Sequence, residues 1–197
     1  MAPRATSAPP AHWGYRSLVD RSVPTLIGAG VVLRAVRADD VGAIVPISFY
    51  DGRAARDEAD AAAMLERIRA DVARGESLHW GICVGGSDLV VGTVGFYRGF
   101  SDGTGELGYV LSEAFRGSGI MTRAVAAVVA YGLGPLGLSR VEAMTDRDNL
   151  ASQAVLRRVG FRLVDETGPT WRFVVSADDA VARVLGERFR GAFRDLG

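Results

Sequence analysis

The chain has 197 residues, of which 48% are hydrophobic and 8% aromatic, an ordinary globular composition that predicts one domain with room for an appendage. All of its 23 Lys+Arg residues are arginine, which excludes enzymes that need a Schiff-base lysine and nucleotide triphosphatases that need the P-loop lysine. The 23 Asp+Glu residues balance them to a net charge of +0, which argues against a general attraction to nucleic acid or to an anionic membrane.

Cysteine and histidine are too few for several kinds of site. Cys83 has no partner for an internal disulfide, and His12 and His79 leave too few ligands for a zinc site, so we expect no metal. No apolar run approaches the roughly 18 residues of a membrane span, and Met1–His12 lacks the apolar core of a secretory signal. We therefore expect a soluble, cytoplasmic protein with no membrane contact, in which Cys83 is a small buried hydrophobe.

The first predicted elements follow an Ala/Pro-rich leader that extends to about Pro24. Val31–Val36 predicts a strand, and Asp39 and Asp40 are good residues for starting the next helix. Pro46 lies within the apolar stretch that follows, so this helix should be short or kinked. Asp57–Arg74 predicts a long amphipathic helix, because apolar residues recur there at helical spacing.

The middle of the chain predicts a hairpin, a third strand and an apolar helix. Strands over His79–Val84 and Leu89–Tyr97 are joined by Gly85–Asp88, a sequence typical of a hairpin turn. A strand over Glu106–Leu111 follows, and Gly119–Leu133 predicts a strongly apolar helix.

The last third alternates strands and helices. We expect a strand over Arg140–Thr145, a helix over Asn149–Val159, strands over Phe161–Asp165 and Trp171–Val175, and a trailing helix over Asp178–Phe193. Hairpins first and β-α-β-α-β later indicate a mixed sheet with helices on both faces. The trailing helix has one apolar face, which fits either a homodimer contact or docking onto its own domain.

Closely spaced glycines open the helix that follows the strand over Glu106–Leu111. The segment Arg116–Ile120 contains Gly117 and Gly119, which allow a close backbone approach to a phosphate at a helix N-terminus, although turn geometry explains such glycines as well. A dinucleotide fingerprint is less favoured, because its third glycine is replaced by Thr122 and five residues separate strand and first glycine.

Two motifs carry a family resemblance. Asp148–Phe161 resembles the N-x-x-S-x-x-V-L-x-x-x-G-F signature of GCN5-related N-acetyltransferases (GNAT) of the ribosomal-protein-acetylating branch, and Arg116–Ile120 resembles their coenzyme-pyrophosphate loop. The resemblance implies an α/β (α+β) GNAT fold, with a mixed, mostly antiparallel twisted sheet of about six to seven strands and helices on both faces. The leader would then be residues 1–24, the acetyltransferase domain 25–176 and a C-terminal helical extension 177–197.

The resemblance also implies acetyl-CoA as donor and a primary amine, such as a protein N-terminus or a small amine, as acceptor. The backbone of Arg116, Gly117, Ser118, Gly119 and Ile120 would then hold the pyrophosphate. An amide of Val110 or Leu111 would polarise the thioester carbonyl, and Asn149 would contact the pantetheine or cap its helix.

The resemblance also suggests candidate catalytic residues. Glu106 occupies the position of the general base in histone-type relatives, or is simply a solvated residue at a strand start. Many relatives carry a catalytic tyrosine where this chain has Leu156, so the tyrosine route is absent. The ribosomal-protein branch resembles this chain in having a serine three residues after the asparagine, so the resemblance makes Ser152 the candidate acid, or it is simply a solvated or back-bonded helix residue. A non-catalytic acyl-CoA-binding or sensing module on the same fold is the alternative. Four aromatic or imidazole side chains are candidates for an acceptor groove or for core positions: His79, Trp80, Tyr97 and Tyr109.

Overall fold

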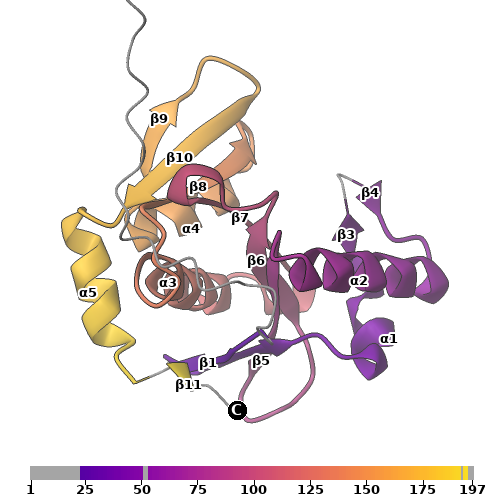
Figure 1. The fold of residues 1–197 in the computed structure, drawn as a ribbon. Coiled ribbons are helices and arrows are strands. Elements are labelled where there is room, and N and C mark those ends of the chain that lie inside the picture. Colours follow the sequence, from indigo (N-terminus) through magenta and orange to yellow (C-terminus); the bar gives the residue numbers. More distant parts are fainter. Residues whose placement is uncertain (1–22, 51–52, 192, 195–197) are drawn as a thin grey trace, which may run out of the picture.

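The computed structural model describes residues 23–50, 53–191 and 193–194 of the chain. Its main feature is one nine-stranded sheet, drawn in Figure 1. In sheet order the strands are β11 (Phe193–Arg194), β1 (Thr25–Gly28), β2 (Val31–Ala35), β5 (Leu78–Val84), β6 (Gly92–Tyr97), β7 (Thr104–Leu111), β8 (Arg140–Asp146), β10 (Thr170–Ser176) and β9 (Arg162–Asp165). A separate two-stranded sheet pairs β3 (Phe49–Tyr50) with β4 (Arg53–Ala54).

Within the described residues, five α-helices cover the two faces of the large sheet. They are α1 (Val41–Ile44), α2 (Glu58–Ala73), α3 (Ile120–Leu133), α4 (Leu150–Val159) and α5 (Ala180–Arg188). Helices α1 and α2 lie on one side, and α3 lies on the other with α4 and α5 beside it (Figure 1). Among the described residues, no helix combines the length and apolar character needed to cross a bilayer.

The two faces bury separate clusters of apolar side chains because strand residues alternate between faces. Trp80, Val94 and Phe96 point toward α3 and belong to the larger cluster, which α3 fills with small residues. Cys83 and Val90 belong to the smaller cluster beneath α1 and α2. The prediction that Cys83 is a buried small hydrophobe is confirmed, since its side chain is 2% exposed.

The predicted mixed, mostly antiparallel sheet is confirmed, with β7 and β8 as its parallel pair within the described part of the chain. The strand count is higher than the expected six to seven, because β1 and β11 extend the sheet at one edge.

The prediction for the C-terminal end of the trailing helix is wrong. Instead of running to Phe193, α5 stops at Arg188, and after a turn at Gly191 (φ 83°) the chain pairs β11 with β1. The apolar face of this helix packs onto its own domain, where Leu185 and Phe189 are 5% and 1% exposed. Most of the predicted leader lies outside the described residues, but Pro24 is tied to the core through its carbonyl, which accepts a 2.7 Å hydrogen bond from Trp80 Nε1.

Capping residues, a proline and a glycine determine where several of the helices begin and end. Asp57 caps α2 by accepting a 2.8 Å hydrogen bond from the Asp60 N–H, and Pro46 turns the segment after α1 into a short 3₁₀ helix. Gly160 ends α4 in the left-handed conformation (φ 101°), as expected for a glycine just past a helix.

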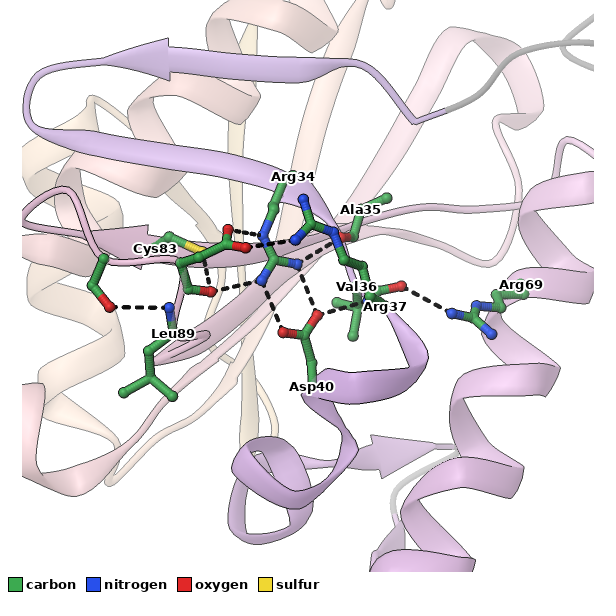
Figure 2. A network of polar contacts seen from close by, with 10 residues as sticks. Arg34, Ala35, Val36, Arg37, Asp40, Arg69, Cys83 and Leu89 are labelled. Atoms are coloured by element: carbon green, nitrogen blue, oxygen red, sulfur yellow. Dashed lines mark hydrogen bonds and ion pairs between the residues drawn. The ribbon is translucent and has the colours of Figure 1, made fainter.

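A buried ion pair fixes the start of α1 against the sheet (Figure 2). The Asp40 carboxylate accepts hydrogen bonds from Arg34 NH1 at 2.7 Å, Arg34 NH2 at 2.8 Å and the Arg37 backbone N–H at 2.7 Å. Arg34 Nε also donates to Asp88 in the β5–β6 loop at 2.7 Å. Burial alone would raise the pKa of Asp40, but the bonds from Arg34 and Arg37 outweigh it and hold that pKa below its usual value. One guanidinium therefore joins β2, the start of α1 and the β5–β6 loop.

Candidate active site

The parallel strands β7 and β8 pair at one end of their length and part at the other. Their register runs from Thr104 opposite Arg140 to Leu107 opposite Ala143, whereas β7 continues to Leu111 and β8 to Asp146. A cavity of about 210 Å³ lies where they part, which we call the β7–β8 cavity. It is lined by Leu107, Gly108, Tyr109, Met144, Thr145, Asp146, Asn149, Ser152 and Thr170.

Backbone groups of β7 face this opening. The Ser112 N–H donates to Val91 on the β6 side at 2.9 Å, and N–H directions alternate along a strand. The Val110 N–H therefore points toward β6, and the N–H groups of Tyr109 and Leu111 point toward the parted edge. Val110 and Leu111 are the two backbone amides predicted to polarise the thioester carbonyl. Of these, only the Leu111 N–H points toward the parted edge, where a ligand could accept its hydrogen bond.

The glycine loop adjoins the end of β7 and opens α3. Gly117 and Gly119 have φ values of 76° and 73°, which non-glycine residues rarely adopt. Arg116 Nε donates to the Leu111 carbonyl at 3.3 Å, so this side chain bends back over the strand end. Ser118 Oγ donates to the Phe115 carbonyl at 2.6 Å, which closes the turn. The structure thus brings the predicted loop and the predicted strand end together.

The surroundings of the glycine loop leave room for a phosphate group. A Cβ at Gly117 would meet no atom within 4 Å, so the loop backbone is open to an approaching ligand. The first N–H groups of α3 have no partner within the helix and carry its positive dipole end. Arg123, whose NH1 donates to the Ser118 carbonyl at 3.2 Å, adds a cation one turn into α3.

Ser152 has a partner that the sequence did not reveal. Its Oγ lies 2.8 Å from the hydroxyl oxygen of Tyr109, which also lines the β7–β8 cavity. Burial raises the pKa of Tyr109 to about 12, although the hydrogen bond with Ser152 works in the opposite direction. The available signal was strand alternation, which places Tyr109 on the face of β7 that α3 and α4 cover.

Asn149 caps α4. Its Oδ1 accepts a 3.0 Å hydrogen bond from the Ser152 N–H, so the capping role considered for it is present in the structure. Because Asn149 also lines the β7–β8 cavity, its contact with a ligand stays a prediction.

The candidate base lies apart from the candidate acid. Glu106 is on the opposite face of β7 from Tyr109, directly across from Tyr97 of β6, and forms an ion pair with Arg98. It is about one-third exposed (32%) and lines neither cavity described here. Leu156, at the position where relatives carry a tyrosine, is fully buried in the core.

A second cavity of about 340 Å³ lies between the sheet and the α1 and α2 segments, and we call it the α1–α2 cavity. It shares Gly108 and Tyr109 with the β7–β8 cavity. Of the four acceptor-groove candidates, His79, Tyr97 and Tyr109 line it, whereas Trp80 is a core residue on the other face. The complete lining is Ile44, Ile47, Ser48, Ala61, Met64, Leu65, Ile68, His79, Thr93, Tyr97, Gly108, Tyr109 and Val110.

Gly108 lines the floor of the α1–α2 cavity, and Gly95 lies on the strand between the floor residues His79 and Gly108. His79, Gly95 and Gly108 are in register across β5, β6 and β7. A Cβ at Gly95 would collide with the Leu78 carbonyl, and one at Gly108 would lie 2.9 Å from the ring of Tyr97. The floor is therefore held close to the backbone at both positions.

The sheet is mixed, and its two parallel strands part beside a helix that begins at a glycine loop. This arrangement agrees with the acetyltransferase class that the sequence motifs suggested. The Acetyltransferase (GNAT) domain family matches residues 31–162, and the chain belongs to this family. Among curated proteins it is 40% identical over 99 residues to the probable N-acetyltransferase YjcK of Bacillus subtilis, a match that covers 49% of this chain and 52% of YjcK. The chain thus spans about half the length of the curated relatives it matches.

Solved structures confirm the fold. RimJ of Mycobacterium smegmatis, in complex with a CoA-disulfide, superposes with a TM-score of 0.66 at 24% identity, over 84% of this chain and 93% of RimJ. RimL, a ribosomal L7/L12 α-N-protein acetyltransferase in complex with coenzyme A, gives a TM-score of 0.68 at 20% identity, over 77% of this chain and 97% of RimL.

Proposed function

We propose that this chain is an acetyl-CoA-dependent N-acetyltransferase that moves an acetyl group directly to a primary amine on a protein N-terminus or a small molecule. The observation that carries the proposal is the β7–β8 cavity, which the hydrogen-bonded Ser152 and Tyr109 line. The strand β7 that borders this cavity ends at Leu111, where Arg116 of the glycine loop contacts it. Membership of the GNAT domain family supports the reaction class. The RimJ and RimL complexes support coenzyme A as the carrier and an α-amine as one kind of acceptor.

The glycine loop would hold the coenzyme's pyrophosphate. The N–H groups around Gly117 and Gly119 and the dipole of α3 favour a dianion there, and Arg116 and Arg123 add positive charge. Acetyl-CoA supplies the activated acetyl group as a thioester. The Leu111 N–H, directed into the parted edge, is the donor we assign to the carbonyl oxygen on which negative charge develops.

The protein has two proton transfers to arrange. A cationic amine first loses one proton to solvent, which frees its lone pair. As the C–N bond then forms and the C–S bond breaks, the amine must lose a further proton and the departing sulfur must gain one. We assign the removal of this further proton to Glu106, directly or through water, and the protonation of the sulfur to Ser152. Because its pKa is about 12, Tyr109 keeps its proton at neutral pH. When Tyr109 donates to Ser152 Oγ, the serine hydrogen is free to point toward the sulfur.

Coenzyme binding is tested by thermal unfolding with acetyl-CoA. A ligand at 100 times its Kd stabilises the folded state by about 2.7 kcal/mol, which is readily measured as a rise in Tm. Gly117→Glu should abolish the rise, because the carboxylate would occupy the anion site. Gly137→Glu is the matched control, since Gly137 has the same φ of 76° and equally open surroundings in another loop. An unchanged Tm for the wild type at millimolar acetyl-CoA would refute the proposal.

Turnover is tested by release of the coenzyme thiol with a panel of amines. Ser152→Ala and Tyr109→Phe should each lower kcat by about 10²-fold or more with little change in the KM for acetyl-CoA, as expected for loss of a proton donor. Glu106→Gln should lower kcat in the same way, and unaltered turnover would remove Glu106 from the mechanism. Binding of acetyl-CoA without thiol release to any amine would instead identify the acyl-CoA-binding module, the reading that the buried Leu156 keeps open.

A further inference from the structure

The α1–α2 cavity has apolar walls and is closed on three sides by different elements. Ile44 and Ile47 come from the α1 segment, and Met64, Leu65 and Ile68 come from α2. All five side chains are at most 8% exposed. A volume of about 340 Å³ corresponds to about eleven water volumes, so a group of about ten non-hydrogen atoms fits. Such walls favour an apolar occupant.

The floor of the cavity carries an imidazole without a partner. His79 is 7% exposed and lines the cavity, and its imidazole ring makes no hydrogen bond to another of the described residues. Its one recorded contact there is with the Tyr97 ring, at a centroid distance of 5.8 Å. A neutral imidazole has one donor and one acceptor nitrogen. Because His79 lines the cavity, these nitrogens are available to a hydrogen-bonding group on an occupant.

No charged side chain lines the α1–α2 cavity among the described residues. Burial lowers the pKa of His79 to about 4, so the imidazole is uncharged at neutral pH. A second cationic group on an acceptor would lose its hydration in this cavity without gaining a carboxylate partner, which is costly. Polyamines and aminoglycosides are therefore poorly matched to it.

The α1–α2 cavity also opens onto the place where transfer would occur. Gly108 and Tyr109 line both cavities, and the parting of β7 from β8 begins directly after Leu107. A molecule seated between α1, α2 and the sheet can thus present one end at the mouth of the β7–β8 cavity.

We propose that the α1–α2 cavity binds the body of the acceptor, and that this body is uncharged, largely apolar and about as large as a leucyl or phenylalanyl group, with one hydrogen-bonding group paired to His79. The reacting amine is then the acceptor's single positive charge. This inference rests on the proposed acetyltransferase function and adds the chemical class of the acceptor. His79 is a positioning residue in it, because it binds the acceptor body away from the reacting atoms.

The size of the acceptor body is tested with amino acid amides. Phenylalaninamide and leucinamide should be acetylated with a kcat/KM at least about tenfold above that of alaninamide or spermidine. Ala61→Leu, which adds three carbons to the cavity wall, should lower kcat/KM for phenylalaninamide by about tenfold and leave alaninamide within about twofold. Ala63→Leu is the matched control on the exposed side of α2 and should change neither.

The imidazole is tested by comparing two amines that differ in a carboxamide. His79→Phe keeps a ring but removes both nitrogens, so it should raise the KM for phenylalaninamide by about fivefold while KM for phenethylamine and for acetyl-CoA stay constant. His79→Gln, which restores a neutral donor and acceptor, should recover part of the loss. A purely structural role would instead lower the Tm and affect both amines equally.

Two outcomes overturn this inference while leaving acetyl transfer intact: faster acetylation of spermidine than of phenylalaninamide, or an unchanged amide preference in Ala61→Leu. Failure of the proposed function has another signature. In that case acetyl-CoA would give no thermal protection and no amine would release thiol from wild type or variants, which overturns both.

Discussion

Replacing one carboxylate oxygen of Asp40 by an amide nitrogen tests how much the buried ion pair stabilises the folded state. Asp40→Asn keeps the size of the side chain but removes its charge and one of the two acceptor oxygens that hold Arg34. The two side chains are 8% and 10% exposed, so the guanidinium would be left in a largely dry place with only Asp88 as a counter-charge. The change therefore isolates what the carboxylate does for the folded state.

Breaking a buried ion pair by removing one partner costs about 3–5 kcal/mol. The lower end applies to Arg34, because Asp88 remains bonded to it at 2.7 Å from a more exposed position. We therefore expect Asp40→Asn to lower the free energy of unfolding by about 3 kcal/mol, and the Tm by about 6–12 °C for a chain of this length. Asp39→Asn, an adjacent exposed carboxylate, is the matched control and should have little effect.

The measurement is urea and thermal unfolding followed by circular dichroism at several pH values. Because Asp40 has a folded-state pKa below its usual value, its contribution is present above an ordinary aspartate pKa of about 3.9 and is lost as pH falls through the folded pKa. The difference between wild type and Asp40→Asn should accordingly be full at pH 7 and shrink below about pH 4. A loss no larger than that of Asp39→Asn at pH 7 would refute the reasoning.

Three further predictions concern packing, capping and reactivity. Gly160→Ala should destabilise the fold by about 2 kcal/mol more than Gly30→Ala in denaturant titrations. Both glycines have positive φ, but only the Cβ at Gly160 would lie 2.7 Å from Val181 methyl carbons. Equal losses of stability would argue against the clash. Asn149→Ala should cost about 1 kcal/mol and Asn149→Asp much less, because aspartate retains the cap; if Asn149→Asp keeps its Tm but weakens acetyl-CoA binding, the residue also contacts the coenzyme. Cys83, whose thiol pKa is raised by burial, should react with a thiol reagent only after unfolding, and rapid labelling of the native protein would contradict its burial.

Sequence patterns predicted those elements that carry their own periodicity and end signals. The helix over Asp57–Arg74 has both an N-cap and a regular apolar stripe, and the structure places α2 over Glu58–Ala73 with Asp57 as its cap. Strands β1 and β11 could not be found this way. Each is four residues or fewer, which is too short for a clear alternating pattern. Strand β11 pairs with β1 from the other end of the chain, and β1 pairs in addition with β2, the next strand along the chain.

Some features of the candidate site could likewise be predicted from the sequence, and others could not. The glycine loop is contiguous in sequence, so a motif could reveal it. The contact between Tyr109 and Ser152 joins residues 43 positions apart on a strand and a helix, and the apolar walls that meet His79 come from other elements again. Such contacts are set by how helices lie on the sheet, and a single sequence does not specify that. Glu106 differs from these residues, because its position on the strand suggested a general base from sequence alone. In the structure its carboxylate forms an ion pair with Arg98.

If the α1–α2 cavity binds the acceptor as proposed, Gly95 and Gly108 limit how the acceptor preference can change. Any side chain at Gly95 or Gly108 meets backbone or the Tyr97 ring, so single substitutions on the sheet are more prone to disrupt the fold than to reshape the cavity. The helical walls carry no such restriction, because residues such as Ile47 and Met64 can be exchanged for other apolar side chains at little cost. Under the proposal, substitutions in α1 and α2 should therefore change the acceptor preference more readily than substitutions at these two sheet positions.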